Sequence, residues 1–482
     1  MPDLSSSPAV SATLSRALDT VAAVSTPPGR GGVALIRISG PDAAGIGRRI
    51  FFPAGAAHPD ERPRTAVYGR IRRPGGAEPG EYIDTGLAVF FRAPGSFTGE
   101  DTLEITCHGG ILVTRAVLAA ALAAGARQAE RGEFTRRAFA SGRIDLTEAE
   151  ALGLLIDAGT DAQLRLSHSG MNGKLAEACS SLRDGITSLL ADIYVRIDFP
   201  EEDLGSMPDA ELAERLSSLT EKTDALRMSY RTGRAVAEGI PAVICGNTNT
   251  GKSTLFNRFT GRDDAIVTDI AGTTRDTLTA KVAAGDVTLL LSDTAGIHGG
   301  PADPVEAIGM DRARAGIAGA ELILYMIDGS APPSDDDLLL AGSLRDGREG
   351  ETVALLSKSD LPAHPDAVSL WETFPHRLRV SPLDGSGFDD LVKTIEELFI
   401  DGSIDIAEDA VVASARQRDA LDRAADGLRA ARKAMEDGYT ADILSVCLED
   451  AAGALSELDG RGAGAVSADV TEKIFSSFCV GK

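Results

Sequence analysis

The spacing of apolar residues changes along the chain, and each change predicts a different kind of structure. From about residue 20 to 125, short apolar runs such as VALIRI and GLAVFF alternate with Gly/Pro turns around one helix-like stretch, ILVTRAVLAAALAAGA. This texture is typical of a mixed α+β domain. From about 146 to 235, and again after 405, Leu and Ile recur at three- and four-residue intervals. That period indicates amphipathic helices.

Between about 240 and 400 the pattern returns to buried-type strands separated by helix-length segments. The apolar runs are PAVIC, VTLLL, ELILYMI, TVALL and RLRVS. Such alternation is typical of a doubly wound parallel sheet. Because helical segments flank it on both sides, we expect one discontinuous helical domain with an α/β domain inserted. The predicted divisions are an α+β domain at 1–125, a first helical segment at 126–237, the inserted domain at 238–402 and a second helical segment at 403–482.

Composition narrows the class of protein. The 482 residues are 43% hydrophobic with a formal net charge of −24, which fits a globular chain and argues against non-specific coating of nucleic acid. No apolar run reaches the ~18 residues of a membrane span, and the first residues lack the pattern of a secretory signal. A cytoplasmic location is therefore expected. Five cysteines without a Cys-x-x-Cys pair suggest neither a zinc site nor disulfides.

A local basic patch remains possible despite the acidic net charge. Its five candidate arginines are more simply interpreted as solvated residues on helical faces: Arg127, Arg131, Arg136, Arg137 and Arg143.

The stretch GNTNTGKS, residues 246–253, has the spacing of a phosphate-binding loop. It follows the predicted strand PAVIC and precedes the helix-like TLFNRF, so backbone N–H groups and a helix N-terminus would face the anion. Lys252 is expected to reach the β- and γ-phosphate oxygens, and Ser253 to bind Mg²⁺. Further on, the stretch VTLLLSDTAG predicts a buried strand that ends at Asp293. The Asp293 carboxylate is suited to hold Mg²⁺ through water, and the N–H of the following Gly296 is suited to bind the γ-phosphate.

The order of these motifs resembles the small GTPases. Thr274, in DIAGTTRD, is placed to close a mobile switch on the metal. Guanine recognition is expected at SKSD, residues 357–360, where the carboxylate of Asp360 would accept two hydrogen bonds from the base. Ser357 replaces the usual Asn, which predicts an affinity loss of ~1 kcal/mol for one missing hydrogen bond. After DTAG, Ile297 has no polar group to orient the attacking water, so another residue must do so.

Six motifs extend the resemblance over nearly the whole chain from about residue 20. They are TPPGRGGVALIRISG (26–40), SFTGEDTLEITCHGG (96–110), RGEFTRRAFASGRIDLTEAEAL (131–152), DFPEED (198–203), DIAGTTRD (269–276) and IFSSFCVGK (474–482). In this order they resemble the MnmE, or TrmE, tRNA-modification GTPases. The resemblance implies a folate-binding and dimerising N-terminal domain, a discontinuous helical domain and an inserted G domain.

The resemblance also implies an activity and its partners. Members work as homodimers in a heterotetramer with the FAD protein MnmG (GidA). Together they build a carboxymethylaminomethyl-type group on C5 of the wobble uridine of certain tRNAs. The carbon comes from a tetrahydrofolate derivative, the 5,10-methylene or 5-formyl form.

Site residues follow from the motifs that match. By resemblance Glu306 orients water as the catalytic group, K⁺ is held by Asn249, Thr268, Ile270 and Thr273, and Mg²⁺ by Ser253 and Thr274. The folate site uses Arg37, Glu100, Arg143 and Lys482. The thiol of Cys479 lies near the folate, where catalysis and structural placement both stay open. The expected GTP-binding residues are Asn249, Thr250, Gly251, Lys252, Ser253, Thr254, Thr268, Thr273, Thr274, Asp293, Gly296, Ser357, Lys358, Asp360 and Ser381.

A second class of function competes with this one. A GTPase related to ribosome-assembly factors would act as a binding switch, with helical segments that only recruit RNA or protein. The SFTGEDTLEITCHGG stretch and the absence of a basic RNA-binding module in the sequence weigh against it.

Overall fold

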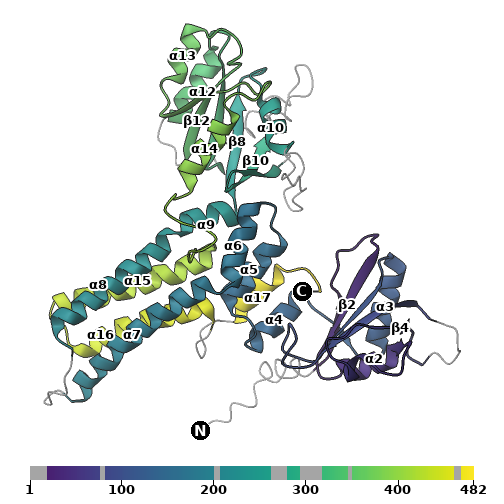
Figure 1. The fold of residues 1–482 in the computed structure, drawn as a ribbon. Coiled ribbons are helices and arrows are strands. Elements are labelled where there is room, and N and C mark those ends of the chain that lie inside the picture. Colours follow the sequence, from purple (N-terminus) through teal and green to yellow (C-terminus); the bar gives the residue numbers. More distant parts are fainter. Residues whose placement is uncertain are drawn as a thin grey trace. The chain divides into compact units, whose positions relative to one another are not determined.

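The computed structural model describes residues 19–75, 82–199, 207–261, 279–293, 317, 319–345, 350–460 and 468–481. Its chain divides into two compact units (Figure 1). The first comprises residues 1–150 and 460–482, and the second comprises residues 151–459. Among the described residues no helix is long and apolar enough to cross a membrane.

The first unit is built on a seven-stranded sheet with the order β3-β4-β5-β6-β2-β1-β7. All of its pairings are antiparallel except that of β1 with β7. Apolar side chains of β2, β5 and β6 pack with helices α2 and α3 into one core, because alternate strand residues point to the same face. The strands are β1 Val21–Val24, β2 Val33–Ser39, β3 Phe51–Pro53, β4 Val67–Ile71, β5 Asp84–Phe91, β6 Thr102–His108 and β7 Arg127–Gln128. The helices are α2 Ala43–Ile50, the short 3-10 helix η2 Pro59–Glu61, α3 Ile111–Ala123, α4 Glu133–Ala140, α5 Leu146–Ile156, which runs into the second unit, and α17 Ala468–Ser476.

This unit extends beyond the expected division at residue 125. Strand β7 pairs with β1 in the register Val21 with Arg127, so it belongs to the sheet. At two residues, it is too short to leave a period in the sequence. Residues 460–482, expected in the second helical segment, also group with this unit, and Val480 forms a β-bridge with Arg131.

The helical domain of the second unit is formed by two separate segments of the chain. Four long helices, α7, α8, α15 and α16, pack side by side (Figure 1), and their Leu, Ile and Ala side chains form a single buried cluster. The structure therefore confirms the discontinuous helical domain. The helices are α6 Asp161–Met171, α7 Lys174–Asp198, α8 Asp209–Met228, α9 Tyr230–Ala237, α15 Ala415–Glu436 and α16 Ala441–Asp459.

The inserted α/β domain has a six-stranded sheet with the order β13-β12-β11-β8-β10-β9. Five strands are parallel, as expected for the predicted doubly wound sheet, and the edge strand β9 pairs antiparallel with β10. Helices α10 and α14 cover one face and α12 and α13 the other (Figure 1). The strands are β8 Ile240–Gly246, β9 Thr279–Ala284, β10 Val287–Asp293, β11 Leu322–Asp328, β12 Glu351–Ser357 and β13 His376–Arg379. The helices are α10 Lys252–Thr260, α12 Asp335–Arg345, α13 Pro365–Trp371 and α14 Phe388–Phe399.

Candidate functional site

The loop between β8 and α10 has the backbone that a phosphate cradle requires. Gly246 has φ 141°, and a Cβ there would lie 2.3 Å from the carbonyl oxygen of Met326. Gly251 has φ 96° and immediately precedes α10. Asn249 also adopts a left-handed conformation, with φ 59°. These positive φ values turn the chain back toward the N-terminus of α10, where helix N–H groups favour an anion.

The polar side chains of this loop are folded onto it. The Nζ atom of buried Lys252 donates to the carbonyl oxygen of Asn247 at 2.6 Å, and the hydroxyl of Thr250 donates to the same oxygen at 2.9 Å. Ser253 and Thr254 are exposed in the first turn of α10. The Lys252 ammonium now donates to a neutral carbonyl oxygen. A hydrogen bond to a charged phosphate oxygen would be stronger, because both of its groups would be charged. The loop is therefore arranged to receive a phosphate group.

A second group of predicted residues lies where β12 and β13 end. Lys358 has φ 57°, and its Nζ atom donates to Oδ2 of Asp328 at 2.6 Å. Burial alone would raise the pKa of Asp328, but hydrogen bonds from Lys358 and Ser330 hold it below its usual value. The buried hydroxyl of Ser357 donates to the carbonyl of Ile327 at 3.0 Å, whereas Asp360 is exposed. The Ser357 proton is thus engaged within the domain, and Asp360 remains the predicted contact to the base.

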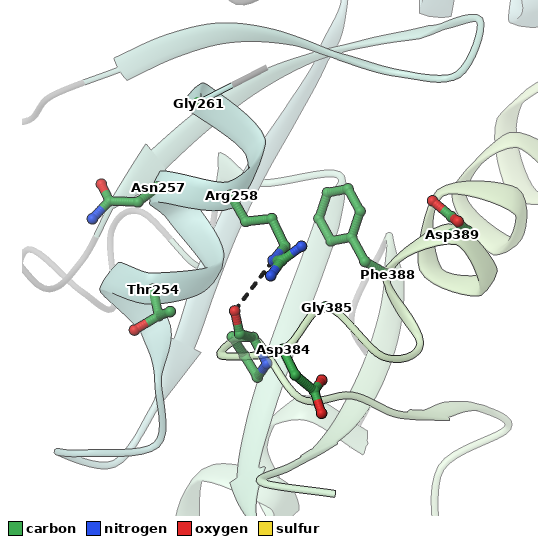
Figure 2. A pocket seen from close by; sticks show the side chains of 9 residues that line it. Thr254, Asn257, Arg258, Gly261, Asp384, Gly385, Phe388 and Asp389 are labelled. Atoms are coloured by element: carbon green, nitrogen blue, oxygen red, sulfur yellow. Dashed lines mark hydrogen bonds between the residues drawn. The ribbon is translucent and has the colours of Figure 1, made fainter. Parts of the chain in front are cut away.

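A cavity of about 540 Å³ lies between α10 and the segment that joins β13 to α14. Figure 2 shows Thr254, Asn257 and Arg258 on one side and Asp384 and Phe388 on the other. The cavity contacts the first turn of α10 through Thr254, and it contacts the loop that begins with buried Ser381 through the neighbouring Pro382. It therefore adjoins both predicted halves of the nucleotide site.

Asp293 ends β10, and its main chain is in register with Ile244 of β8, the strand that leads into the phosphate loop. Several other predicted residues lie outside the described residues of the chain. The predictions for the remaining residues stay predictions: Thr268, Ile270, Thr273, Thr274, Gly296, Glu306 and Lys482.

In the first unit, two predicted folate residues belong to a cluster of ion pairs. Arg37 pairs with Glu104 at 2.8 Å, and its guanidinium lies 5.4 Å from the ring centroids of Phe97 and Phe134. Glu100 accepts a hydrogen bond from the Ser39 hydroxyl at 2.7 Å. The orientation of both side chains is thus fixed by neighbours before any ligand binds.

Arg137 links Glu100 to a deeper region of this cluster. Its Nη1 atom donates to both carboxylate oxygens of Glu100, at 3.0 and 3.2 Å, and its Nη2 atom donates to Asp19 and Glu133. Burial alone would raise the pKa of Glu133, but hydrogen bonds from Arg127 and Arg137 hold it below its usual value. Arg127 and Arg137 therefore form ion pairs within the unit. Neither of the two interpretations from the sequence, a basic patch or solvated helical faces, describes them.

The segment after α17 docks onto β1 of the same unit. Phe478 is buried, and the carbonyl of Gly481 accepts a hydrogen bond from the Ser25 hydroxyl at 2.8 Å. Cys479 is a free, exposed thiol, and its carbonyl accepts from the N–H of Gly132 at 3.4 Å. Arg143 is exposed and packs beside Gly99, because a Cβ on that glycine would lie 3.2 Å from Cγ of Arg143. The docked segment holds Cys479 in a defined place.

Gly481 is the residue that most restricts this docking. Its φ is 103°, and a Cβ there would lie 2.0 Å from the carbonyl oxygen of Val24. We expect Gly481→Ala to speed hydrogen exchange of the Gly132 amide, which donates to the carbonyl of Cys479, about tenfold, since the strain and clash cost on the order of 1–3 kcal/mol. Gly142→Ala is the matched control, because Gly142 has φ 71° with nothing within 4 Å of an added Cβ. Equal exchange in the two variants would contradict this account.

Sequence reasoning missed the supporting roles of two side chains, Asp328 and Arg137, the second of which it considered only for a basic patch or a solvated helical face. Asp328 ends β11 at the sheet edge where Asp293 ends β10 and Ser357 ends β12, so the rule that ligands bind at the carboxyl ends of strands would have found it. Arg137 lies four residues after Glu133 on α4, a spacing at which opposite charges meet. Neither residue was assigned a role from the sequence motifs.

Comparison with known proteins gives the family. Two family models match the chain: "GTP-binding protein TrmE N-terminus" over residues 20–143 and "MnmE helical domain" over residues 146–479. The tRNA modification GTPase MnmE of Roseiflexus sp. (strain RS-1) is 40% identical over 474 residues, 96% of this chain and 99% of that protein. The protein of the same name from Acetivibrio thermocellus is 37% identical over 471 residues, again 96% and 99%. A solved structure, Era of Aquifex aeolicus bound to GDP and AlF4−, is 22% identical with a TM-score of 0.27 and covers 39% of this chain and 65% of its own. With two family models and full-length relatives in agreement, the chain belongs to the MnmE (TrmE) family of tRNA modification GTPases.

Proposed function

We propose that this chain is a potassium-dependent GTPase that works in the cytoplasm with an MnmG-type FAD protein. Together they would add a carboxymethylaminomethyl-type group to C5 of the wobble uridine of tRNA, with a tetrahydrofolate derivative as one-carbon donor. As a family member the chain is a GTP hydrolase acting in tRNA modification. The MnmG-type partner, the heterotetramer and the folate follow from the family resemblance. A ribosome-assembly switch is not proposed, because the family models cover the N-terminal and helical domains as well.

The phosphate loop carries the GTPase component of the proposal. Buried Lys252 and the glycine backbone around it are arranged for the β- and γ-phosphates. Mg²⁺ prefers oxygen ligands, and the exposed hydroxyl of Ser253 at the start of α10 fits that preference, with Thr274 as the proposed second ligand. The side-chain oxygen of Asn249 is the proposed ligand for K⁺. When bound, these cations would supply positive charge to the phosphates, while Lys252 and the loop N–H groups orient them.

The folate component of the proposal rests on Glu100. An ionised carboxylate has about four acceptor positions, and Arg137 and Ser39 together occupy three with their hydrogen bonds. The side chain is 23% exposed, so it remains accessible to a ligand. Glu100 is therefore suited to accept a hydrogen bond from the N–H edge of a pterin. Arg37 and Arg143 would contribute positive charge for the carboxylates of the glutamate tail.

An exposed apolar face supports the proposed homodimer through the N-terminal domain. Tyr68 is opposite Leu87 on neighbouring strands, and both are exposed, at 57% and 44%. Val33, at 66%, lies on the same sheet opposite His108. Large exposed apolar side chains gathered on one sheet are typical of surfaces that bind another protein.

The test of the folate assignment is binding of 5-formyltetrahydrofolate to the full chain by isothermal titration calorimetry. We expect Glu100→Gln to weaken binding about tenfold or more, because a hydrogen bond to a charged group contributes ~1.5–3 kcal/mol. Glu130→Gln is the control, since Glu130 pairs with Arg136 on the same unit and its side chain is 42% exposed. A chain that hydrolyses GTP yet binds no reduced folate at millimolar concentration would refute the one-carbon component of the proposal.

A further inference from the structure

Arg258 is the side chain that joins helix α10 to the loop after β13. It lies six residues after Lys252 on α10. Its Nε atom donates to the carbonyl of Pro382 at 3.2 Å, and its Nη2 atom donates to the carbonyl of Leu383 at 3.4 Å. Figure 2 shows the side chain reaching across from α10 to this loop. One guanidinium thus holds two successive carbonyls of the loop.

The loop itself is shaped around this guanidinium. A Cβ on Gly385 would lie 2.4 Å from Nη1 of Arg258, and Gly385 has φ 94°, so no other residue fits there without a shift. The N–H of Gly385 donates to the carbonyl of Ser381 at 2.8 Å, and the N–H of Ser381 donates to the carbonyl of Ser386 at 2.9 Å. The loop is therefore a closed turn, and Arg258 fills the position next to its glycine.

An aromatic contact fixes the guanidinium from another side. The Cζ atom of Arg258 lies 6.0 Å from the ring centroid of Phe388, at the start of α14. Phe388 in turn packs on Phe259, with ring centroids 4.8 Å apart. Because this ring pair belongs to the core, it would remain when the arginine is removed. Loss of Arg258 should therefore free the loop and leave the domain folded.

We infer that Arg258 is a positioning residue for guanine selection. The inference rests on the proposed function and on the predicted GTP-binding residues, of which Asp360 would contact the base and Lys252 the phosphates. Ser381, also predicted to bind GTP, begins the loop that Arg258 holds, and we place this loop beside the base. The N-terminus of α10 would bind phosphate while the second turn of the same helix fixes the base loop. A helix is a stiff connection, so Arg258 sets the distance between the two halves of the nucleotide site.

The test compares nucleotide binding by two arginine variants of the full chain, measured by calorimetry with GDP and ADP. Arg258→Ala should raise the Kd for GDP about tenfold and that for ADP much less, because the base loop loses two hydrogen bonds to a charged donor. In steady-state GTP hydrolysis the increase in KM should exceed the decrease in kcat. Arg377→Ala is the matched control. Arg377 also donates to one main-chain carbonyl, that of Phe374 at 3.0 Å, and stacks on one ring, that of Trp371, in the same domain.

A third variant, Asp360→Ala, separates failure of the inference from failure of the proposed function. If Asp360→Ala abolishes the preference for GDP and Arg258→Ala reduces it while Arg377→Ala does not, the inference is supported. If Asp360→Ala abolishes the preference and Arg258→Ala preserves it, the base site is correctly assigned and the inference about Arg258 is overturned. If the unmodified chain does not prefer GDP over ADP, or if Asp360→Ala retains that preference, the base assignment fails and the inference falls with it. A loss of affinity in Arg258→Ala that is equal for GDP and ADP would show a general structural role and would also overturn it.

Discussion

Asp360→Asn is expected to lower kcat/KM for GTP by about a hundred- to a thousandfold and to raise kcat/KM for xanthosine triphosphate. The proposed contact is bidentate, with the carboxylate accepting N–H bonds from N1 and N2 of guanine. Each hydrogen bond to a charged group contributes ~1.5–3 kcal/mol, and the asparagine NH₂ would face a guanine donor, which leaves both groups unpaired. Xanthine has an oxygen in place of the 2-amino group, so the same NH₂ can donate to it.

The structure favours a large effect because the Asp360 turn is held on both sides. The N–H of Ser359 donates to the carbonyl of Val380 at 3.2 Å, and the N–H of Leu361 donates to the carbonyl of Lys358 at 2.9 Å. Because this backbone is fixed, a small movement of the turn cannot restore the contacts that the substituted side chain loses. Asp366→Asn is the control, since Asp366 is an exposed aspartate on α13 of the same domain. An unchanged preference for GTP over the xanthine nucleotide in Asp360→Asn would remove Asp360 from base recognition.

The elements of the fold that sequence predicts well are those whose signal is local. PAVIC, VTLLL and TVALL are largely apolar runs, and all three are strands of the sheet. The strands of PAVIC and TVALL contribute side chains to the cores on both faces, which is why apolar residues follow one another in them. The phosphate loop is equally readable, since the positive φ values of Gly246 and Gly251 restrict the residue type. In these cases the physical requirement falls on consecutive residues.

The features that sequence does not predict depend on residues far apart in the chain. Asp19 and Arg137 form an ion pair across 118 positions, and Ser25 contacts Gly481 across 456. Neither contact leaves a period or a spacing in the sequence. The same holds for Arg258, whose position on α10 identifies it only as a helix residue until the loop at Pro382 is placed beside it. For this reason the supporting contacts of both candidate sites were accessible only from the structure.

Replacing K⁺ by Na⁺ at equal ionic strength should reduce GTP hydrolysis by about a hundredfold or more, within the range seen when one group that stabilises transition-state charge is removed. Apart from Lys252, the phosphate loop GNTNTGKS contains no cationic side chain, and Ile297 offers no polar group to the reaction. We propose that, besides Mg²⁺, a bound K⁺ supplies further positive charge at the β- and γ-phosphates, with Asn249 as its ligand. Asn249 suits this task because it is exposed in a left-handed turn of the loop.

Asn249→Ala should therefore make hydrolysis slow and equal in KCl and NaCl, measured as phosphate release at saturating GTP. Thr248→Ala is the neighbouring control, because Thr248 is exposed in the same loop and contacts only Asn247 among the hydrogen bonds that the structure describes. It should keep its dependence on K⁺. If the unmodified chain hydrolyses GTP equally well in both salts, the transition-state charge is met by some other group. If only Asn249→Ala loses the distinction between the two cations, the side-chain oxygen of Asn249 is required for the dependence of hydrolysis on K⁺.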